Sequence, residues 1–133
     1  MKGDTVVRGS EVNYYVSPAV EDGDGTLFSP WNSISEHVGV LIPGDTLFLR
    51  GGLYQENQTI RVSASGLPDA PITLATYQGE PAEVRTPDTV CIARLDGSYV
   101  VLDGMFLNKA GTRGECARIV GDNCSMFCAR RLW

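Results

Sequence analysis

Histidine and closely paired cysteine are scarce in this sequence. His37 is the single histidine, and the four cysteines (Cys91, Cys116, Cys124 and Cys128) form no CxxC pair. Zinc sites draw their ligands from such pairs and from histidine, so the sequence predicts no zinc site. We expect the cysteines to be small buried residues of strands, because free cysteine is among the most buried residue types. A disulfide between Cys124 and Cys128 is the alternative, if the chain turns back between them.

Long apolar runs and clusters of basic residues are also missing. No segment is long enough to span a bilayer, and residues 1–11 lack the apolar stretch of a signal peptide. As written, the chain is expected in the cytoplasm, or outside the cell if a leader has been removed. The net charge of -5 would repel a phosphate backbone, and no glycine-rich phosphate loop is present. We therefore expect neither nucleic acid nor a membrane as a partner.

The composition that is present fits one globular domain. A chain of 133 residues with 43% hydrophobic and 20% charged residues can bury a core without metal or disulfide support. Fifteen glycines and seven prolines are dispersed along the chain, which predicts many turns rather than a flexible linker. We expect a single domain over residues 1–133, with residues 1–11 as a flexible N-terminal segment.

A short helix is predicted over residues 31–42. Ser33 stands three residues before Glu36, the spacing of a capping box, in which each side chain satisfies a backbone donor of the other residue. Apolar residues then recur at helical spacing, and Pro43 and Gly44 end the segment. We expect His37 on the surface of this helix. The residues expected to face the core are Ile34, Val38 and Leu41.

After this helix the sequence consists of short β-rich runs, each closed by Gly, Pro, Asn or Asp. Comparable runs begin at Leu47, Ile72 and Val100, at intervals in the mid-twenties, and a second set begins at Ile60, Val84 and Met105. Such a period predicts a solenoid of stacked strands, although a β-sandwich is an alternative. The residue pairs expected to point inward are Leu47 and Leu49, Ile60 and Val62, Ile72 and Leu74, and Val100 and Leu102.

The order of motifs resembles the N-terminal coils of right-handed parallel β-helix proteins of the polysaccharide-lyase type, such as pectate and alginate lyases. The motifs are "YYVSP", "DGTLFSPW", "PGDTLFLRGGLYQE", "SGLPDAPITLATYQGEP" and "SYVVLDGMFL", between Tyr14 and about Asn123. The resemblance implies an all-β fold, a short right-handed parallel β-helix (solenoid) with an N-terminal capping helix at 31–42 and stacked coils over 45–128. In such proteins the helix covers the open first coil, with Trp31 expected half-exposed at its rim, and Gly44 and Asp45 turn the chain into the first stacked strand.

The resemblance carries over no catalytic residue. The lyases of this type place their catalytic base and calcium-binding carboxylates on later coils, which have no counterpart here. We therefore expect a non-catalytic β-helix module that binds carbohydrate or serves a structural role. Two alternatives stay open: a lyase-like carbohydrate-active enzyme that is active only as an assembly, and a truncated inactive relative of one.

Candidate sugar-binding residues are few. Lys109 and Arg113 lie on a predicted turn, where two cations would suit a uronate sugar, although solvated turn residues are the plainer reading. Five aromatic residues offer rings of the kind that stacks on sugars, although structural use is expected for most of them. They are Tyr14, Tyr15, Trp31, Tyr54 and Tyr77, of which Tyr54 and Tyr77 are the candidates for carbohydrate binding.

The "EDGDG" loop is a candidate calcium site. Glu21, Asp22 and Asp24 lie within four residues of one another, with Asp22 and Asp24 as the favoured ligands. Asp and Gly are also the residues that any tight turn selects, so a turn without metal is the alternative. No other cofactor is predicted.

The C-terminal end of the stack is predicted to be an interface. No second amphipathic helix closes this end, so an open coil would expose apolar residues to water. We expect a homo-oligomer that joins chains through this uncapped coil, unless the tail folds back to cover it. The interface residues expected are Met126, Phe127, Leu132 and Trp133.

Overall fold

The computed structural model describes residues 12–18, 20–87, 92–109 and 117–130, with backbone alone for Lys109 and residues 127–130. The segment of residues 1–11, predicted to be flexible, lies outside the described residues. The strands are β2 (Asn13–Val16), β3 (Thr46–Leu49), β4 (Gly52–Gln55), β5 (Ile60–Val62), β6 (Ile72–Thr76), β7 (Ala82–Thr86), β8 (Ala93–Leu95), β9 (Val100–Lys109), β10 (Ala117–Ile119) and β11 (Ser125–Arg130). Two short 3-10 turns accompany them, η2 (Val38–Val40) and η3 (Tyr77–Gly79).

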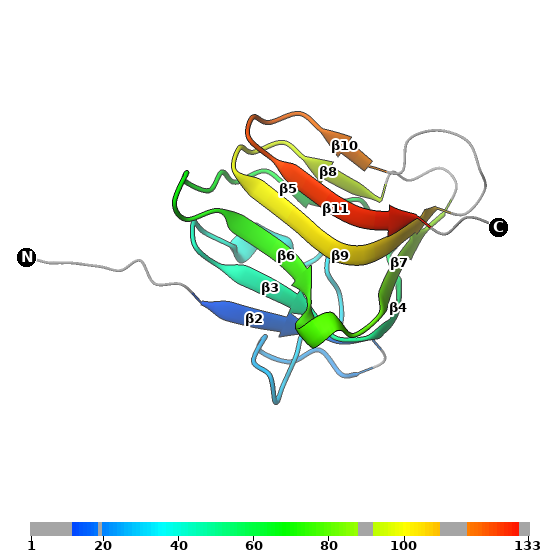
Figure 1. Ribbon diagram of the computed structural model, residues 1–133. Helices are drawn as coiled ribbons and strands as arrows, with labels where there is room; N and C mark the ends of the chain where they lie inside the picture. Colours follow the sequence, from blue (N-terminus) through cyan, green and yellow to red (C-terminus); the bar gives the residue numbers. More distant parts are fainter. Residues whose placement is uncertain (1–11, 19, 88–91, 110–116, 131–133) are drawn as a thin grey trace, which may run out of the picture.

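The strands stack into three parallel ladders (Figure 1). The first ladder runs β2, β3, β6, β9 and β11, and the second runs β4, β7 and the far half of β9. The third ladder runs β5, β8 and β10. The chain visits the ladders in turn and pairs one strand of each coil with the next coil, which is a parallel β-helix. The β-sandwich alternative is wrong, because a sandwich pairs its strands antiparallel.

Alternating residues fill the interior of the coils, as expected. Leu47 pairs with Leu74 and Leu74 with Leu102, so like side chains stack above one another. All four predicted inward pairs are buried. The second proposed repeat set is wrong, because Ile60 pairs with Ala93 in the third ladder whereas Val84 belongs to the second. Residues of two different faces share the same alternation, so spacing alone could not separate them.

Glycine allows the sharp bend between the first two ladders. Gly104 has a φ of 95° in the middle of β9, a conformation that costs little without a Cβ atom. A Cβ at this position would lie 2.7 Å from the hydroxyl oxygen of Thr76. The long strand β9 can therefore belong to both ladders and pair with β6 on one side of the bend and β7 on the other.

The predicted helix at 31–42 is not present. Trp31 instead forms an isolated bridge with Val16, residues 35–37 form a turn, and only the 3-10 turn η2 follows. Gly39 lies within this segment, and glycine is among the poorest helix formers. The predicted core residues of the segment are nevertheless buried: Ile34, Val38 and Leu41.

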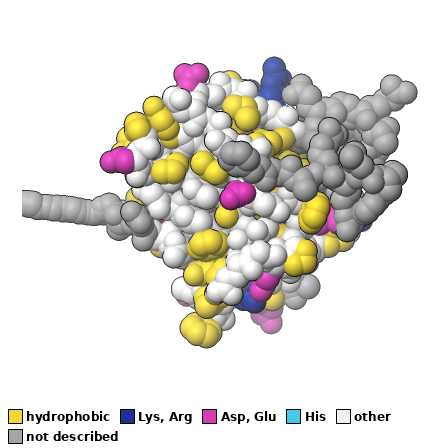
Figure 2. All heavy atoms as spheres, in the orientation of Figure 1, with side chains coloured by type: hydrophobic (Ala, Val, Ile, Leu, Met, Phe, Trp, Pro, Cys, Tyr) yellow, Lys and Arg dark blue, Asp and Glu magenta, His cyan; other side chains and the backbone are white. Residues whose placement is uncertain are grey.

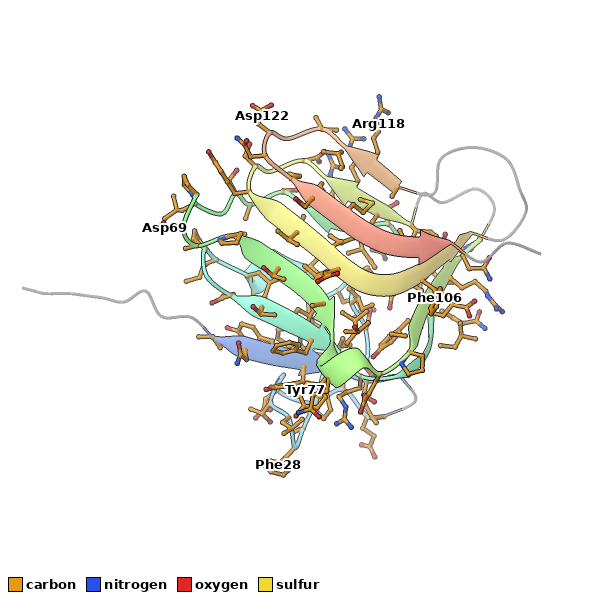
Figure 3. The ribbon with its side chains drawn as sticks, in the orientation of Figure 1. Phe28, Asp69, Tyr77, Phe106, Arg118 and Asp122 are labelled. Carbon is orange, nitrogen blue, oxygen red and sulfur yellow. The ribbon has the colours of Figure 1, made fainter. Side chains whose placement is uncertain are left out.

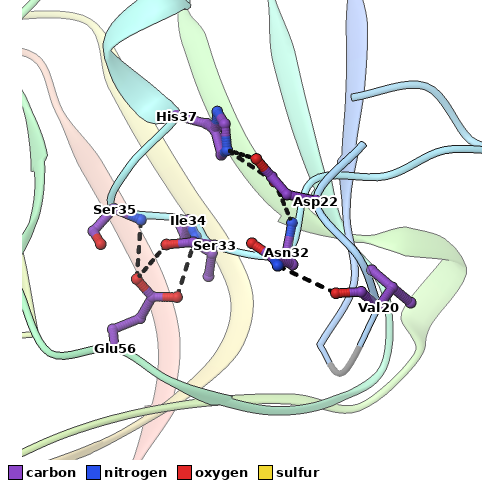
Figure 4. A network of polar contacts seen from close by, with 8 residues as sticks. All are labelled: Val20, Asp22, Asn32, Ser33, Ile34, Ser35, His37 and Glu56. Carbon is purple, nitrogen blue, oxygen red and sulfur yellow. Dashed lines mark hydrogen bonds and ion pairs between the residues drawn. The ribbon is translucent and has the colours of Figure 1, made fainter. Parts of the chain in front are cut away.

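The predicted capping box is also wrong, because a distant carboxylate replaces that of Glu36 (Figure 4). Glu56 follows β4 and is only 4% exposed. Its carboxylate accepts hydrogen bonds from the backbone N–H groups of Ile34 at 3.1 Å and Ser35 at 3.0 Å, and from the Ser33 hydroxyl at 3.3 Å. Buried backbone donors need an acceptor, and a carboxylate fixed by the stacked coil satisfies two of them.

The entry into the stack is held by aromatic and carboxylate contacts. Trp31 is 6% exposed and stacks on Tyr14 at 4.8 Å and on His37 at 4.5 Å, so its predicted place at a half-exposed rim is wrong. Asp45 accepts from the N–H groups of Val12 and Ile42, both at 3.0 Å, at the point where the chain turns into β3. No helix among the described residues is long and apolar enough to cross a membrane.

Candidate carbohydrate-binding surface

Three rings on the outer side of the first ladder form a group that we call the outer aromatic cluster: Tyr15, Phe48 and Tyr77. Tyr14 and Leu47 point inward, so the next residue of each strand, Tyr15 and Phe48, points outward. The two are paired in register, and their rings stack with centroids 5.6 Å apart. All three rings are half-buried. Figure 2 shows hydrophobic side chains at the surface over these strands.

The third ring comes from the turn after β6. The strand residue paired with Phe48 is Ala75, which is too small to continue the aromatic row. Tyr77 instead leans onto both rings from η3, edge-on, at 5.5 Å from Tyr15 and 5.7 Å from Phe48. Edge-to-face and offset-stacked contacts at these distances are the favoured arrangements of aromatic pairs. The cluster is therefore ordered by its own contacts, and Figure 3 shows Tyr77 at the outer corner of the molecule.

An ion pair borders the cluster. The Arg50 guanidinium lies 5.0 Å from the centre of the Tyr77 ring and donates to both carboxylate oxygens of Glu80, at 2.9 and 3.2 Å. Glu80 also accepts from the backbone N–H of Gly51 at 2.9 Å. The hydrogen bond from Arg50, with that from Gly51, lowers the pKa of Glu80, and the bond to Glu80 raises the pKa of Arg50. Both groups stay charged at neutral pH.

This arrangement suits a sugar ring. Aromatic faces stack on apolar C–H surfaces, and charged groups beside them accept from or donate to hydroxyls. Arg50 and Glu80 are 35% and 34% exposed in their side chains, so both are reachable from solvent. The surface therefore offers aromatic rings and charged groups to a sugar, and the charge of Arg50 is balanced by that of Glu80.

The predicted sugar-binding residues are only partly brought together. Tyr77 belongs to the cluster, but Tyr54 is 2% exposed and its hydroxyl donates to the carbonyl oxygens of Val16 and Arg50. Burial raises the pKa of Tyr54, and a ring so enclosed cannot stack on a sugar, so that prediction is wrong. The side chain of Lys109 and all of Arg113 lie outside the described residues.

Sequence reasoning missed Phe48, Arg50 and Glu80. A signal for Phe48 was available, since it alternates with the correctly predicted inward pair of Leu47 and Leu49. None was available for the ion pair, because Arg50 and Glu80 meet only once the second coil lies on the first.

The acidic loop is ordered by its own hydrogen bonds. Asp24 accepts from the N–H and the hydroxyl of Thr26, at 3.1 and 2.8 Å, which lowers its pKa. Asp22 accepts from the N–H of Asn32 and lies 3.0 Å from His37 Nε2, and these two contacts lower its pKa. His37 packs on Trp31 rather than on a helix surface. Within the described part of the chain no three His, Cys, Asp or Glu residues gather as metal ligands, and calcium binding stays a prediction.

The C-terminal end is described only in part. Met126 is half-buried and packs against the core, while Ile119 in the last coil is 46% exposed. The side chain of Phe127, and all of Leu132 and Trp133, lie outside the described residues, so the predicted oligomer stays a prediction.

One cysteine side chain is described. Cys124 is half-buried with a free thiol, which donates to the Gly97 carbonyl oxygen at 3.2 Å. The cysteines were expected to be buried in strands, and Cys124 meets this only in part, because it is half-buried and directly precedes β11. Cys91, Cys116 and the side chain of Cys128 lie outside the described residues.

Comparisons with known proteins agree with this architecture. No protein-family model matches the chain. A 67-residue stretch, 50% of the chain, is 40% identical to pectate lyase PEL9 of Emericella nidulans and corresponds to 16% of that protein. Among solved structures, pectate lyase Pel9A matches 87% of the chain with a TM-score of 0.69 at 24% identity, and a rhamnogalacturonan lyase matches 84% with a TM-score of 0.67 at 20% identity.

The chain spans only part of these relatives, 32% of the Pel9A structure and 34% of the rhamnogalacturonan lyase structure. The predicted resemblance to β-helix proteins of the polysaccharide-lyase type is confirmed.

Proposed function

We propose that this chain is a carbohydrate-binding portion of a polysaccharide-lyase-like β-helix protein, and that the outer aromatic cluster is its sugar-binding surface. The likeness to pectate lyases and to a rhamnogalacturonan lyase supports the ligand class. The observation that carries the proposal is the cluster itself, three ordered and partly exposed rings beside the Arg50 and Glu80 pair.

In this proposal the chain binds and does not cleave. A lyase acting on a uronate needs a base for the proton beside the carboxylate and a cation for the charge that develops. The described cation nearest the cluster, Arg50, is already paired with Glu80. The lyase-like enzyme and the truncated relative are the second candidates, favoured by the identity to pectate lyase PEL9.

A binding experiment tests the proposal. The native chain and the variant Tyr77→Ala are titrated with pectin-derived oligosaccharides, both esterified and free-acid, by calorimetry. Loss of one stacked ring is expected to weaken binding by roughly 1 kcal/mol, about five-fold. Phe28→Ala is the matched control, because Phe28 is 96% exposed on a loop and is not one of the three stacked rings. Equal weakening by both variants, or no binding by the native chain, would contradict the proposal.

Turnover is tested separately. Absorbance of unsaturated uronate products is expected to stay at background with pectate, alginate and glycosaminoglycans. Product formation that rises with protein concentration and is lost in Lys109→Ala would establish the enzyme instead, and would place the predicted Lys109 in its site.

We further propose self-association through the last coil. Ile119 and Val120 are 46% and 53% exposed there, although Val62 and Leu95, which occupy the position of Ile119 in the coils below, are buried. A second copy of the chain would cover these apolar residues. Sedimentation at micromolar concentration is expected to show a homo-oligomer that dissociates on Phe127→Asp, and a strictly monomeric native chain would contradict this.

A further inference from the structure

Three arginines form a vertical row on the outer side of the third ladder, which we call the arginine ladder: Arg61, Arg94 and Arg118. Arg61 of β5 pairs in register with Arg94 of β8, and Arg94 pairs with Arg118 of β10. Their strand neighbours face the interior, so the three side chains face solvent. Adjacent strands lie about 4.8 Å apart, so the ladder places cations at that spacing.

One carboxylate is inserted between the first two rungs. Asp96 accepts from Nε of Arg94 at 2.7 Å with one oxygen and from Nε of Arg61 at 2.6 Å with the other. The hydrogen bonds from Arg94 and then Arg61 lower the pKa of Asp96. The carboxylate bridges two guanidinium groups one coil apart. A carboxylate therefore fits between arginines of neighbouring coils in this ladder.

Within the described residues, no equivalent carboxylate lies between Arg94 and Arg118. Position 96 of the middle coil corresponds to Val120 in the coil above, since Leu95 pairs with Ile119. Arg118 is exposed, and Figure 3 shows it projecting outward from β10. Of the described arginine side chains off the ladder, Arg50 pairs with Glu80 and Arg85 with Glu83.

The unmatched charge costs stability. Like charges directly opposite on neighbouring strands destabilise a sheet, and the one aspartate here pairs with only two of the three arginines. Residues that break a local rule without internal compensation are expected at functional positions. A carboxylate from outside, placed between Arg94 and Arg118 as Asp96 is placed between Arg61 and Arg94, would supply the compensation.

We propose that the arginine ladder binds an acidic polysaccharide whose chain runs along the stack, with a carboxylate of one sugar unit received between Arg94 and Arg118. Arginine holds carboxylates through paired N–H donors, and Asp96 leaves the terminal nitrogens of Arg61 and Arg94 free of hydrogen bonds to it. The proposal rests on the proposed function for its ligand class, and it uses a different face from the outer aromatic cluster.

Three polymers test the ladder: polygalacturonate, the same polymer with its carboxylates methyl-esterified, and dextran sulfate. The native chain is expected to bind polygalacturonate at least ten-fold more tightly than the ester, with affinity falling as salt rises. Arg118→Gln is expected to lower the affinity for polygalacturonate about five- to ten-fold. Arg85→Gln, a change of the same type on the second ladder, is expected to leave it within two-fold.

The outcomes separate the two proposals. Weakening by Tyr77→Ala but not by Arg118→Gln would overturn the ladder and keep the aromatic surface, and the reverse result would keep the ladder and overturn the aromatic surface. Equal binding of the ester, equal effects of Arg118→Gln and Arg85→Gln, or binding of dextran sulfate without polygalacturonate would each overturn the ladder. Because Arg118 is exposed, its variant is expected to fold, and an unchanged melting profile or a slightly higher midpoint checks this.

Discussion

The outer aromatic cluster and the arginine ladder are built in the same way and behave differently. Each contains outward-facing strand residues that the parallel register places on neighbouring coils, and the cluster adds Tyr77 from the turn η3. In the cluster the neighbours attract one another, and the cation beside them has its own carboxylate. In the ladder the neighbours repel one another, and the carboxylate of Asp96 contacts Arg61 and Arg94 but not Arg118.

The difference shows how a parallel β-helix separates stability from recognition. The interior of the described coils is mainly apolar and stacked in register, so the core sets the geometry of all three faces. The outward residues then decide whether a face is complete by itself, as in the cluster, or is left with a charge that a ligand can satisfy, as in the ladder.

Truncating a core residue that supports both faces should weaken the outer aromatic cluster and the arginine ladder alike. Leu74 is fully buried between Leu47 and Leu102, so Leu74→Ala is expected to lower the free energy of unfolding by about 2–5 kcal/mol and to weaken binding at both faces. Denaturant unfolding measures the loss. Thr73→Ala, one residue away and half-buried, is the control and is expected to cost under about 1 kcal/mol. Similar losses for the two variants would contradict the stacked core.

A change near the entry of the stack should affect the two faces unequally. Glu56→Gln replaces a buried carboxylate that satisfies Ile34 and Ser35, with an expected loss of about 1–3 kcal/mol. Binding at the aromatic cluster should suffer more than binding at the ladder, because β2 lies beside this segment.

The matched control for that experiment is Glu36→Gln. Glu36 is exposed and is the residue that the capping-box pattern favours. Thermal unfolding is expected to respond to Glu56→Gln alone. A larger effect of Glu36→Gln would favour the capping box and would contradict the stabilising role assigned to Glu56.

Neutralising one arginine on each face should give opposite signs. Arg118→Gln relieves repulsion from Arg94 and is expected to stabilise the unliganded chain by at most ~0.5 kcal/mol. Arg50→Gln removes the partner of Glu80 and is expected to destabilise it. The difference in melting temperature should shrink as salt rises, because exposed charges are screened. Stability changes of the same sign for Arg118→Gln and Arg50→Gln would contradict the proposed difference between the two faces.

Acid should remove stability from both faces through their carboxylates. The pKa values of Glu80 and Asp96 are lowered in the folded chain, so their contribution is complete above the unfolded values near 4.5 and 3.8 and is lost as pH falls through the lower folded values. Melting temperature against pH is the measurement. Glu80→Gln and Asp96→Asn should each flatten the acid limb slightly, and curves that overlay the native one would contradict the assigned contacts.

Much of the fold followed from local patterns. Alternation at Leu47 and Leu49 and at Ile72 and Leu74 identified the inward faces, because a strand exposes every second residue to the core. The predicted capping box failed because Glu56 supplies the acceptor from a segment more than twenty residues away, a contact that local spacing does not encode.

The site was predicted less well for the same reason. Tyr77 was identified, but Tyr54 has the same residue type and lies in the interior, so composition could not separate them. The arginine ladder depends on pairing Arg61 with Arg94 and Arg94 with Arg118, at unequal spacings along the chain. Only the register of the coils makes these residues neighbours.

The parallel register of the coils also has a consequence for how such a molecule can evolve. Phe48 of β3 and Arg61 of β5 belong to the same coil, so an in-frame duplication of that coil would lengthen the aromatic face and the arginine row together. A polymer bound along the stack would then gain a further point of attachment, and its avidity would grow without any new contact being designed. A single-residue insertion within a strand would do the reverse, because it would turn outward side chains into the core on that coil.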